Sequence, residues 1–255
     1  MREKKVDMRL KSFLLAACLV VAPGLACAAG GSQFIEKANV DVSNQASLQR
    51  GAKYFVNNCL GCHSAQYVRY NRLAEDLGLT EAQVVENLMF TGERIHDTMS
   101  ISMPADDAAT WFGQAPPDLS LTARSRGADW IYSFLKSFYV DPGKPTGVNN
   151  LVLQGASMPH VLWEQQGLQR AVFVEEVDAA GNPHEVFKGF ELERPGTLTP
   201  AEYDAKIRDI TAFLSWAAEP VQLERQSLGI KVILFMVVLM IFAILLKKEI
   251  WKSVH

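Results

Sequence analysis

Apolar residues recur at helical spacing in separate stretches of this 255-residue chain. The first stretch predicts a short amphipathic helix from Ser47 to Asn58, with Leu48, Ala52 and Phe55 on its apolar side. A second helix is predicted to begin at Thr80, because Thr80-Glu81-Ala82-Gln83 has the form of a capping box. The expected apolar side of this second helix is Val84, Val85, Leu88 and Met89.

Two further helices are predicted in the second half of the chain. Asp129 is expected to cap a strongly apolar helix that reaches Phe138 and is buried. Thr199-Pro200-Ala201-Glu202 combines an N-cap, a proline in the first turn and a glutamate at the third position, which is typical of a helix start. The apolar residues after it continue for about four turns and end before Glu219-Pro220. They are Tyr203, Ile207, Ile210, Leu214 and Ala217.

The segments between these helices are predicted to be irregular. Ser100 to Pro117 and Asp141 to Asn150 are rich in proline, glycine and aspartate, as loops are. Around Gly181-Asn182-Pro183 a short alternation of apolar residues predicts at most a small hairpin between Ala171 and Phe190. The expected fold is therefore mainly α, with long loops.

Two apolar runs near the chain ends have the composition of membrane-directed segments. Residues 1–28 combine Arg2, Lys4 and Lys5 with an apolar run and the small residues Ala26-Cys27-Ala28, as in a bacterial secretory signal peptide. Near the other end, Leu228 to Leu246 would span about 28 Å as a helix, close to the hydrocarbon thickness of a bilayer.

These two runs divide the chain into four parts. They are a signal peptide at 1–28, an exported domain at 29–227, a single transmembrane helix at 228–247 and a cytoplasmic tail at 248–255. Lys247, Lys248 and Lys252 follow the apolar run, and the positive-inside bias places this tail in the cytoplasm. We therefore expect a single-pass protein of the bacterial inner membrane with its domain in the periplasm.

Charge is distributed unevenly between these parts. The whole chain has a formal net charge of −3, but residues 29–227 contain 16 basic and 25 acidic residues, a net charge of −9. This balance disfavours nucleic acid as a partner. It fits either an ordinary solvated surface or attraction of a basic partner, for which the acidic residues between Glu175 and Glu193 are the candidate surface.

The chemistry of the chain is concentrated in Cys59-Leu60-Gly61-Cys62-His63. This is the Cys-x-x-Cys-His pattern of c-type haem attachment, in which two thiols bond to the porphyrin and the adjacent imidazole takes an axial position on the iron. A zinc site, a thioredoxin-like redox pair and a structural disulfide would use the same residues. No second cysteine pair follows for zinc, no βαβ pattern surrounds the motif, and a Cys59–Cys62 disulfide would leave His63 unexplained.

The other two of the four cysteines, Cys18 and Cys27, lie in the predicted signal peptide. Cleavage after Ala28 would leave a chain exported to an oxidising space with no spare cysteine for a disulfide framework, which is what covalent haem attachment predicts. The residues alone leave the sixth iron ligand open, with Met103 before Pro104 as one suitable loop position. The full set of candidates is Met89, Met99, Met103, Met158, His96, His160 and His184.

Several motifs together resemble the cytochrome c1 family, the membrane-anchored haem subunits of quinol–cytochrome c oxidoreductase (bc1) complexes. The resemblance extends from about Ser47 to the C-terminus, and His160 departs from it, since a less polar residue is usual there. The motifs are Cys59 to Ser64 with Tyr67 and Arg69 to Leu73 after it, Pro116 to Ser120 with Arg124, Ser157-Met158-Pro159, and Phe213 to Pro220.

The resemblance implies one haem c bound covalently through Cys59 and Cys62, with His63 and Met158 as axial ligands. It also implies that Pro117 packs on the porphyrin and that Arg124 pairs with a haem propionate. Such a protein is an electron-transfer subunit and no enzyme on its own. Its implied partners are cytochrome b, the Rieske iron-sulfur subunit, a periplasmic cytochrome c as electron acceptor, and membrane lipid.

Other functions fit parts of the same pattern. They are a free-standing membrane-anchored carrier or oxidase haem subunit, a haem sensor in which Met158 leaves the iron, and a structural tether. The long segments at Pro116 and Asp141 argue against a minimal carrier. No nucleophile with a base and no phosphate-binding loop competes with the haem motif.

Overall fold

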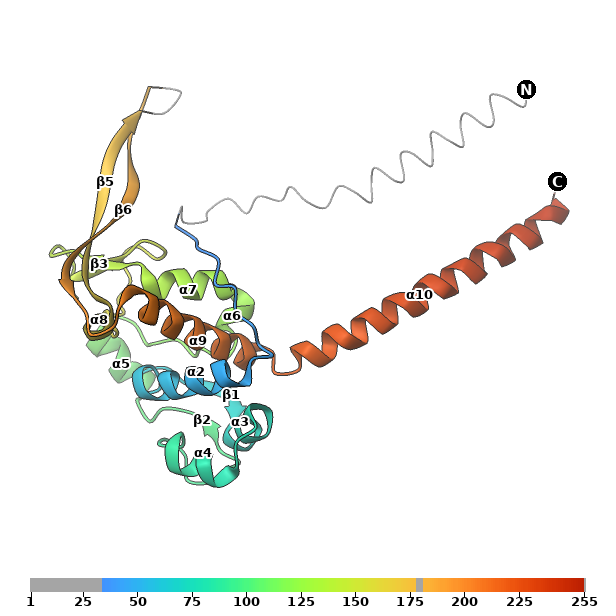
Figure 1. Cartoon of the computed structure of the whole chain (residues 1–255), viewed down its shortest axis with the longest axis horizontal. Coiled ribbons are helices and arrows are strands. Elements are labelled where there is room, and N and C mark those ends of the chain that lie inside the picture. Colours follow the sequence, from blue (N-terminus) through green and yellow to red (C-terminus); the bar gives the residue numbers. More distant parts are fainter. Residues whose placement is uncertain (1–33, 178–180, 255) are drawn as a thin grey trace. The chain divides into compact units, whose positions relative to one another are not determined.

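The structure of the chain is a computed structural model that describes residues 34–177 and 181–254. The predicted signal peptide at 1–28 lies outside the described residues. Figure 1 shows the elements in chain order. The helices are α2 (Gln45–Asn58), α3 (Tyr70–Leu77), α4 (Glu81–Asn87), α5 (Ala105–Phe112), α6 (Thr122–Ser125), α7 (Ala128–Lys136), α8 (Trp163–Gln166), α9 (Pro200–Ala218), α10 (Gln222–Ile250) and the 3₁₀ helix η1 (Trp251–Val254). The strands are β1 (Ala65–Arg69), β2 (Thr98–Met99), β3 (Phe138–Val140), β4 (Val148–Asn150), β5 (Gly167–Val177) and β6 (Pro183–Pro195).

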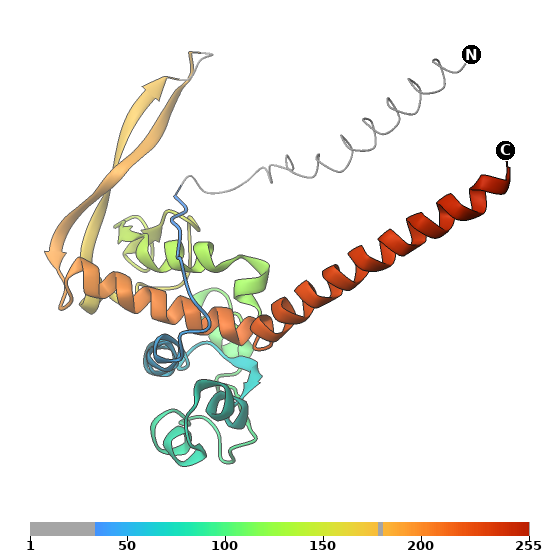
Figure 2. The ribbon, with the colours of Figure 1, turned by 45° about the vertical axis from the view of Figure 1, so that its right-hand side comes forward.

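Helices α2 and α9 pack against each other at the centre of the core, as both ribbon views show (Figures 1 and 2). At Gly51 the two backbones come so close that an added Cβ would overlap the carbonyl oxygen of Asp209 and lie 2.7 Å from the Cβ of Phe213. Beside this contact the rings of Phe55 and Phe213 lie 5.3 Å apart. The glycine at position 51 thus permits a helix crossing that fixes α2, and with it the cysteine that follows α2.

The two predicted capping boxes are confirmed. The side chain of Thr80 accepts from the backbone N–H of Gln83 at the start of α4, and Thr199 accepts from Glu202 at the start of α9, where Pro200 occupies the first turn. The predicted apolar side of α4 is only partly right. Val84 and Leu88 are buried, whereas Val85 is exposed.

The predicted N-cap of α7 is wrong. Gly127, with φ of 92°, is the N-cap, and Asp129 lies in the first turn. The Asp129 carboxylate instead accepts hydrogen bonds from Lys37 Nζ (2.7 Å) and the backbone N–H of Ala38 (2.9 Å). Asp129 therefore holds the N-terminal strap, which we define as residues 34–40, against α7.

Two segments predicted as irregular contain regular structure. Residues 105–112 of the first form α5, and the second is closed by the antiparallel pair of β3 and β4, in which Phe138 faces Asn150. Helix α5 buries only Ala108, so its sequence has no apolar periodicity from which the helix could be predicted. A further short pair, β1 with β2, follows the haem motif.

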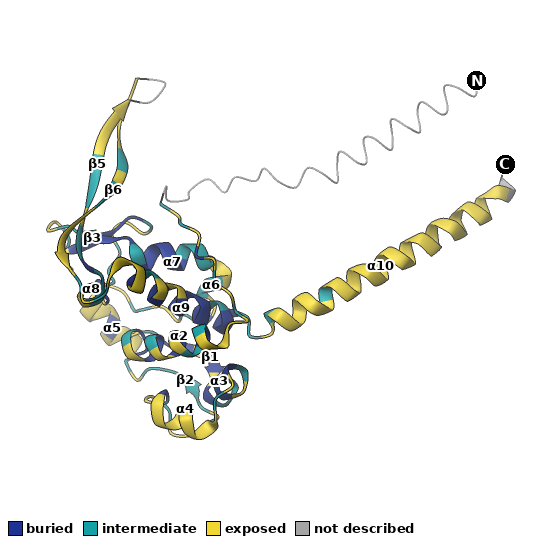
Figure 3. Ribbon diagram, in the orientation of Figure 1, coloured by how far each residue is buried: buried dark blue, intermediate teal, exposed yellow. Residues whose placement is uncertain are grey.

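The hairpin of β5 and β6 is much longer than predicted. Its two strands comprise 11 and 13 residues and pair from Gly167–Pro195 to Val177–Pro183. Most of the hairpin is exposed (Figure 3), and it extends beyond the helices in both ribbon views (Figures 1 and 2). At the middle of its ladder, Phe173, Phe187 and Phe190 form an aromatic cluster with Phe34 of the strap and Tyr139 of β3.

Helix α10 contains the predicted transmembrane segment but begins at Gln222, six residues before Leu228. Within the described part of the chain, α10 is the one helix that is long and apolar enough to cross a membrane. Its side chains are exposed along almost the whole length (Figure 3). The mainly α fold with one long apolar C-terminal helix is as predicted, and an exposed apolar surface of this length fits a membrane anchor.

Candidate functional site

The haem motif forms a tight turn at the C-terminal end of α2. Cys59 is the C-cap of this helix and donates its backbone N–H to Phe55 O at 2.8 Å. The backbone N–H groups of Cys62 and His63 then both donate to Cys59 O, at 3.0 and 2.9 Å. The turn therefore presents two thiols and an imidazole from five consecutive residues.

The two thiols of the motif lie in different environments and are not joined by a disulfide. Cys59 is buried, and burial raises the pKa of its thiol to about 12. Cys62 is exposed. The disulfide interpretation is thus not supported, and one sulfur lies inside the domain while the other faces outward.

His63 has the geometry of a metal ligand whose second nitrogen is occupied. Its Nδ1 lies 2.7 Å from the carbonyl oxygen of Pro117. A carbonyl oxygen can only accept, so Nδ1 carries the proton and Nε2 keeps a free lone pair. Burial lowers the pKa of His63, which favours the neutral ring that binds iron.

The segment around Pro117 is fastened to the motif by further hydrogen bonds. Leu119 N–H donates to Ser64 O (2.8 Å), and the Asp118 carboxylate accepts from the N–H of Gln66 (2.9 Å). Ser120 Oγ accepts from the N–H of Tyr67 at 3.1 Å. The proline-rich segment therefore acts on the site through its backbone carbonyl and through Asp118, contacts that spacing in the sequence did not reveal.

Met158 lies in a loop that two buried asparagines shape. Asn149 Oδ1 accepts from Gly155 N–H at 2.8 Å, and Asn150 Oδ1 accepts from Val152 N–H at 2.9 Å. Met158 is half-buried and packs against the core. A half-buried thioether in an ordered loop can supply a sulfur ligand to a group bound beside the core.

The other predicted sixth-ligand candidates lie in varied surroundings. His160 is buried and stacks on Phe138 with centroids 5.0 Å apart, and burial lowers its pKa to about 4. Met99 is fully buried in β2, and Met89 packs against the core. His96 and His184 are exposed, His184 on the hairpin, and Met103 is half-buried just before α5.

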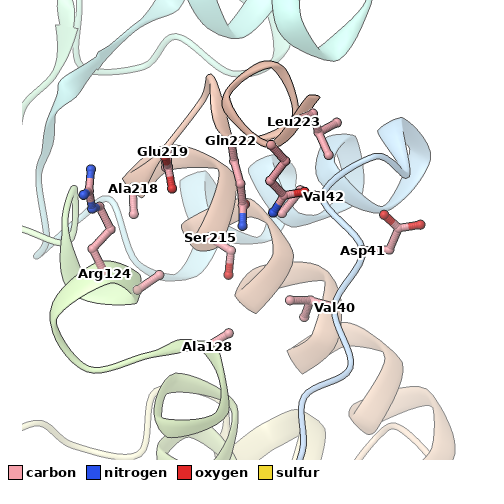
Figure 4. Close-up of a pocket in the computed structure, with 12 residues that line it drawn as sticks. Val40, Asp41, Val42, Arg124, Ala128, Ser215, Ala218, Glu219, Gln222 and Leu223 are labelled. Carbon is pink, nitrogen blue, oxygen red and sulfur yellow. The ribbon is translucent and has the colours of Figure 1, made fainter. Parts of the chain in front are cut away.

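Arg124, the predicted propionate partner, lines a pocket that contains no residue of the haem motif. It is exposed on α6 and lines this pocket with Ser215 and Glu219 of α9 (Figure 4). Among the described residues, no hydrogen bond or ion pair joins its side chain to the haem motif. Arg126, two residues on, lies over the Trp130 ring at 5.4 Å.

Sequence reasoning missed Lys206, a buried cation beside the motif. Its Nζ lies 4.7 Å from the centre of the Tyr54 ring, and no carboxylate of the described residues lies within 4.0 Å of it. Lys206 is close enough to Cys59 for its charge to favour the thiolate. No local pattern identifies such a residue, because α9 brings it to α2 from far along the chain.

The residues present fit a covalently bound haem c. Two free thiols stand at the required spacing, His63 offers an unprotonated Nε2, and Met158 offers a thioether. Within residues 34–177 and 181–254, no three His, Cys, Asp or Glu side chains gather as a metal-binding group. Fold and site together define a c-type cytochrome with a helical anchor.

Comparisons with known proteins identify the family. The family model described as the cytochrome c1 family matches residues 34–254. Cytochrome c1 of Allochromatium vinosum is 50% identical to this chain, over 96% of the chain and 100% of the relative. The ammonia monooxygenase gamma subunit of Nitrosomonas europaea is 41% identical over 97% and 100%, and cytochrome c1 of Rhodospirillum rubrum is 30% identical over 92% and 96%. The chain belongs to the cytochrome c1 family.

Proposed function

We propose that this chain is the haem-bearing electron-transfer subunit of a quinol–cytochrome c oxidoreductase complex. The observation that carries the proposal is the contact of His63 Nδ1 with Pro117 O, which prepares a proximal ligand next to two free cysteines in a chain of the cytochrome c1 family. The partners would be cytochrome b and a Rieske iron-sulfur subunit, which delivers the electron. A periplasmic cytochrome c would accept it.

Each residue of the site has a distinct task in this proposal. Cys59 and Cys62 would hold one haem c through their sulfurs, and His63 Nε2 and Met158 Sδ would be the ligands of its iron. Bound haem c supplies a one-electron couple, which the protein positions and tunes. Pro117 O keeps the proton on His63 Nδ1 and so orients the imidazole. The buried faces of α2 and α9 exclude water from one side of the site.

The membrane arrangement follows from α10. We propose that this helix crosses the inner membrane once, with residues 29–227 in the periplasm and the lysines after Leu246 in the cytoplasm. The domain then remains at the membrane surface, where a Rieske partner can reach it. By itself the chain would catalyse no reaction.

Purification from the native membrane tests the proposal. The full chain is extracted in mild detergent, and the optical spectrum, haem content and co-purifying peptides are measured. We expect a c-type spectrum with one covalent haem, together with b-type haem, cytochrome b and a Rieske peptide. If the purified protein gave a c-type spectrum and cytochrome b were absent in all detergents tested, the chain would instead be a free-standing tethered carrier.

A further inference from the structure

A pocket of about 570 Å³ lies where the domain joins α10, and it contains no residue of the haem motif. Its wall comes from residues 40–42 at the end of the N-terminal strap, α6, the first residue of α7, the end of α9 and the first turns of α10 (Figure 4). The lining residues used below are Asp41, Arg124, Ser215, Glu219, Gln222 and Gln226. The electron-transfer function does not use this pocket.

The pocket lies at the depth of lipid headgroups if α10 is the membrane anchor. Gln222 and Gln226 precede the apolar run that begins at Leu228 by six and two residues, which is about 9 and 3 Å along a helix. The polar layer on each side of the hydrocarbon core is about 5–8 Å thick. A phospholipid beside α10 would therefore have its acyl chains on the exposed apolar surface and its headgroup at the pocket.

The charges lining the pocket have both signs. Arg124 is exposed, and no carboxylate of the described residues lies within 4.0 Å of its guanidinium. Hydrogen bonds from Ser43 lower the pKa of Asp41, and the Arg225 guanidinium lowers that of Glu219, so both carboxylates are ionised near neutral pH. A purely anionic headgroup would meet the unpaired negative charge of Asp41 here, whereas a zwitterion satisfies both signs.

The placement of these groups also fits a zwitterion. In Figure 4, Arg124 and Asp41 stand on opposite sides of the pocket with Gln222 between them. Glu219 is already paired with Arg225 through both carboxylate oxygens, so Asp41 is the more available acceptor. The carboxamides of Gln222 and Gln226, one turn apart on α10, add neutral donors and acceptors.

We propose that this pocket binds the phosphoethanolamine headgroup of a membrane phospholipid, with Arg124 on the phosphate and Asp41 on the ammonium group. A guanidinium suits a phosphate because it can donate two parallel hydrogen bonds. An ammonium group donates to a carboxylate, which the trimethylated headgroup of phosphatidylcholine cannot do. The proposal rests on α10 as the anchor and assigns Arg124 to lipid rather than to a haem propionate.

Lipid retention by the full-length, haem-loaded protein in its assembled complex tests this assignment. The complex is delipidated, reconstituted in nanodiscs of phosphatidylethanolamine, phosphatidylcholine or phosphatidylglycerol, and retained lipid is measured by native mass spectrometry. We expect retention of phosphatidylethanolamine above the other two lipids. Arg124→Gln should reduce its occupancy about tenfold or more, the loss of one charged hydrogen-bond pair. Asp41→Asn should remove the preference over phosphatidylcholine.

Arg126→Gln is the matched control, because Arg126 lies two residues away and contacts Trp130 instead of the pocket. Unchanged retention in Arg124→Gln, or equal retention of phosphatidylglycerol, would overturn the proposal. So would displacement by inorganic phosphate, which would indicate a soluble anion as ligand. A photo-crosslinker at Gln222 that captures a peptide instead of a lipid would do the same.

The haem potential measured on the same samples separates the two possible roles of Arg124. A lipid site leaves the midpoint potential of Arg124→Gln unchanged, whereas a propionate partner would shift it. The absorption spectrum and the co-purifying b-type haem report on the proposed electron-transfer function independently of lipid. Loss of lipid binding with both intact would therefore remove the pocket assignment alone.

Discussion

The crossing of α2 and α9 and the hairpin of β5 and β6 are built by different physics. At the crossing, helices distant in sequence meet at Gly51 with Phe55 and Phe213 fully buried. Asp209, also buried, accepts from Arg50 Nε at 2.7 Å and from Ser47 Oγ at 2.6 Å. The hairpin instead joins residues close in sequence through its backbone ladder, and both of its faces are largely exposed.

This difference separates the rigid part of the molecule from the adaptable part. Buried contacts at the crossing fix the end of α2 and so the position of Cys59, which electron transfer over a set distance requires. On the hairpin, the ion pairs Arg170–Glu191 and Lys188–Glu176 are exposed and contribute little each. Substitutions should therefore be costly at the crossing and mild on the hairpin.

The largest expected effect is on the midpoint potential of the haem, which we expect Met158, packed against the core, to help set. Met158→Lys should keep haem covalently attached but lower the midpoint potential by a few tenths of a volt, part of the ~0.8 V range that axial ligands set. Potentiometric titration of the purified protein measures this. Met103→Lys, at the competing half-buried methionine, is the control and should leave the potential in place; the reverse result would make Met103 the ligand.

Glycine substitutions compare the two regions directly. Gly51→Ala gains about 1 kcal/mol of helix propensity, but its Cβ would overlap Asp209 O and force the helices apart, so we expect a net loss of about 2 kcal/mol or more. Gly189→Ala on β6 meets nothing within 4 Å and should change stability by less than about 0.5 kcal/mol. Urea unfolding of both variants measures the difference. Equal stabilities would show that the crossing can relax.

A smaller effect is expected at Lys206. A buried positive charge near the haem favours the reduced state, so Lys206→Met should lower the midpoint potential, by roughly 40–80 mV for a charge about 10 Å away at an effective dielectric constant near 20. Lys206→Arg should retain the wild-type potential. Lys188→Met, which removes an exposed lysine from the hairpin, should not change it. If the midpoint potential fell by the same amount in Lys206→Met and Lys188→Met, the net charge of the protein and not the position of the lysine would set the effect.

Periodicity made the two helices of the crossing predictable, but not their packing on each other, and it left the hairpin underestimated. Helices α2 and α9 bury one regular side, so their apolar residues recur at helical spacing. Along β5 and β6 burial does not alternate, because the aromatic cluster covers only the middle of the hairpin and most of the other residues are exposed. Helix α5 escaped prediction for a related reason, since it buries Ala108 alone.

The residues of the site also fall into two groups, those that a local pattern predicts and those that only tertiary packing brings together. Cys59, Cys62 and His63 are adjacent in sequence, so their spacing was sufficient to predict a haem motif. The Pro117 carbonyl contacts His63 although Pro117 lies 54 residues further along the chain. The Lys206 ammonium is brought to the motif by α9. Such contacts depend on tertiary packing and not on local pattern. Asp129 shows the same dependence on tertiary packing. It is a residue type typical of helix N-caps, but its carboxylate binds the N-terminal strap.

The smallest predicted effect concerns this strap, which touches both regions. Phe34 packs on Phe187 and Phe190 of the hairpin, whereas the Ala38 end is held by Asp129 near the core. The Lys37 ammonium and the Ala38 amide lower the pKa of Asp129 below its ordinary value near 3.8. A lowered carboxyl pKa stabilises the fold above the ordinary value, and this contribution is lost as the pH falls through the lowered one.

Acid should therefore loosen the strap at Ala38 before it loosens Phe34, because aromatic packing does not titrate. We expect the amide of Ala38 to lose hydrogen-exchange protection below about pH 4, by about 1 kcal/mol or less since the Lys37 side chain is exposed. Asp129→Asn should show weak protection at every pH, and Glu202→Gln, a carboxylate remote from the strap, should behave like wild type. If Ala38 protection were independent of pH in the wild type, the Asp129 contact would not hold the strap. Phe34 on the hairpin and Glu36 on α7 would then anchor the start of the domain.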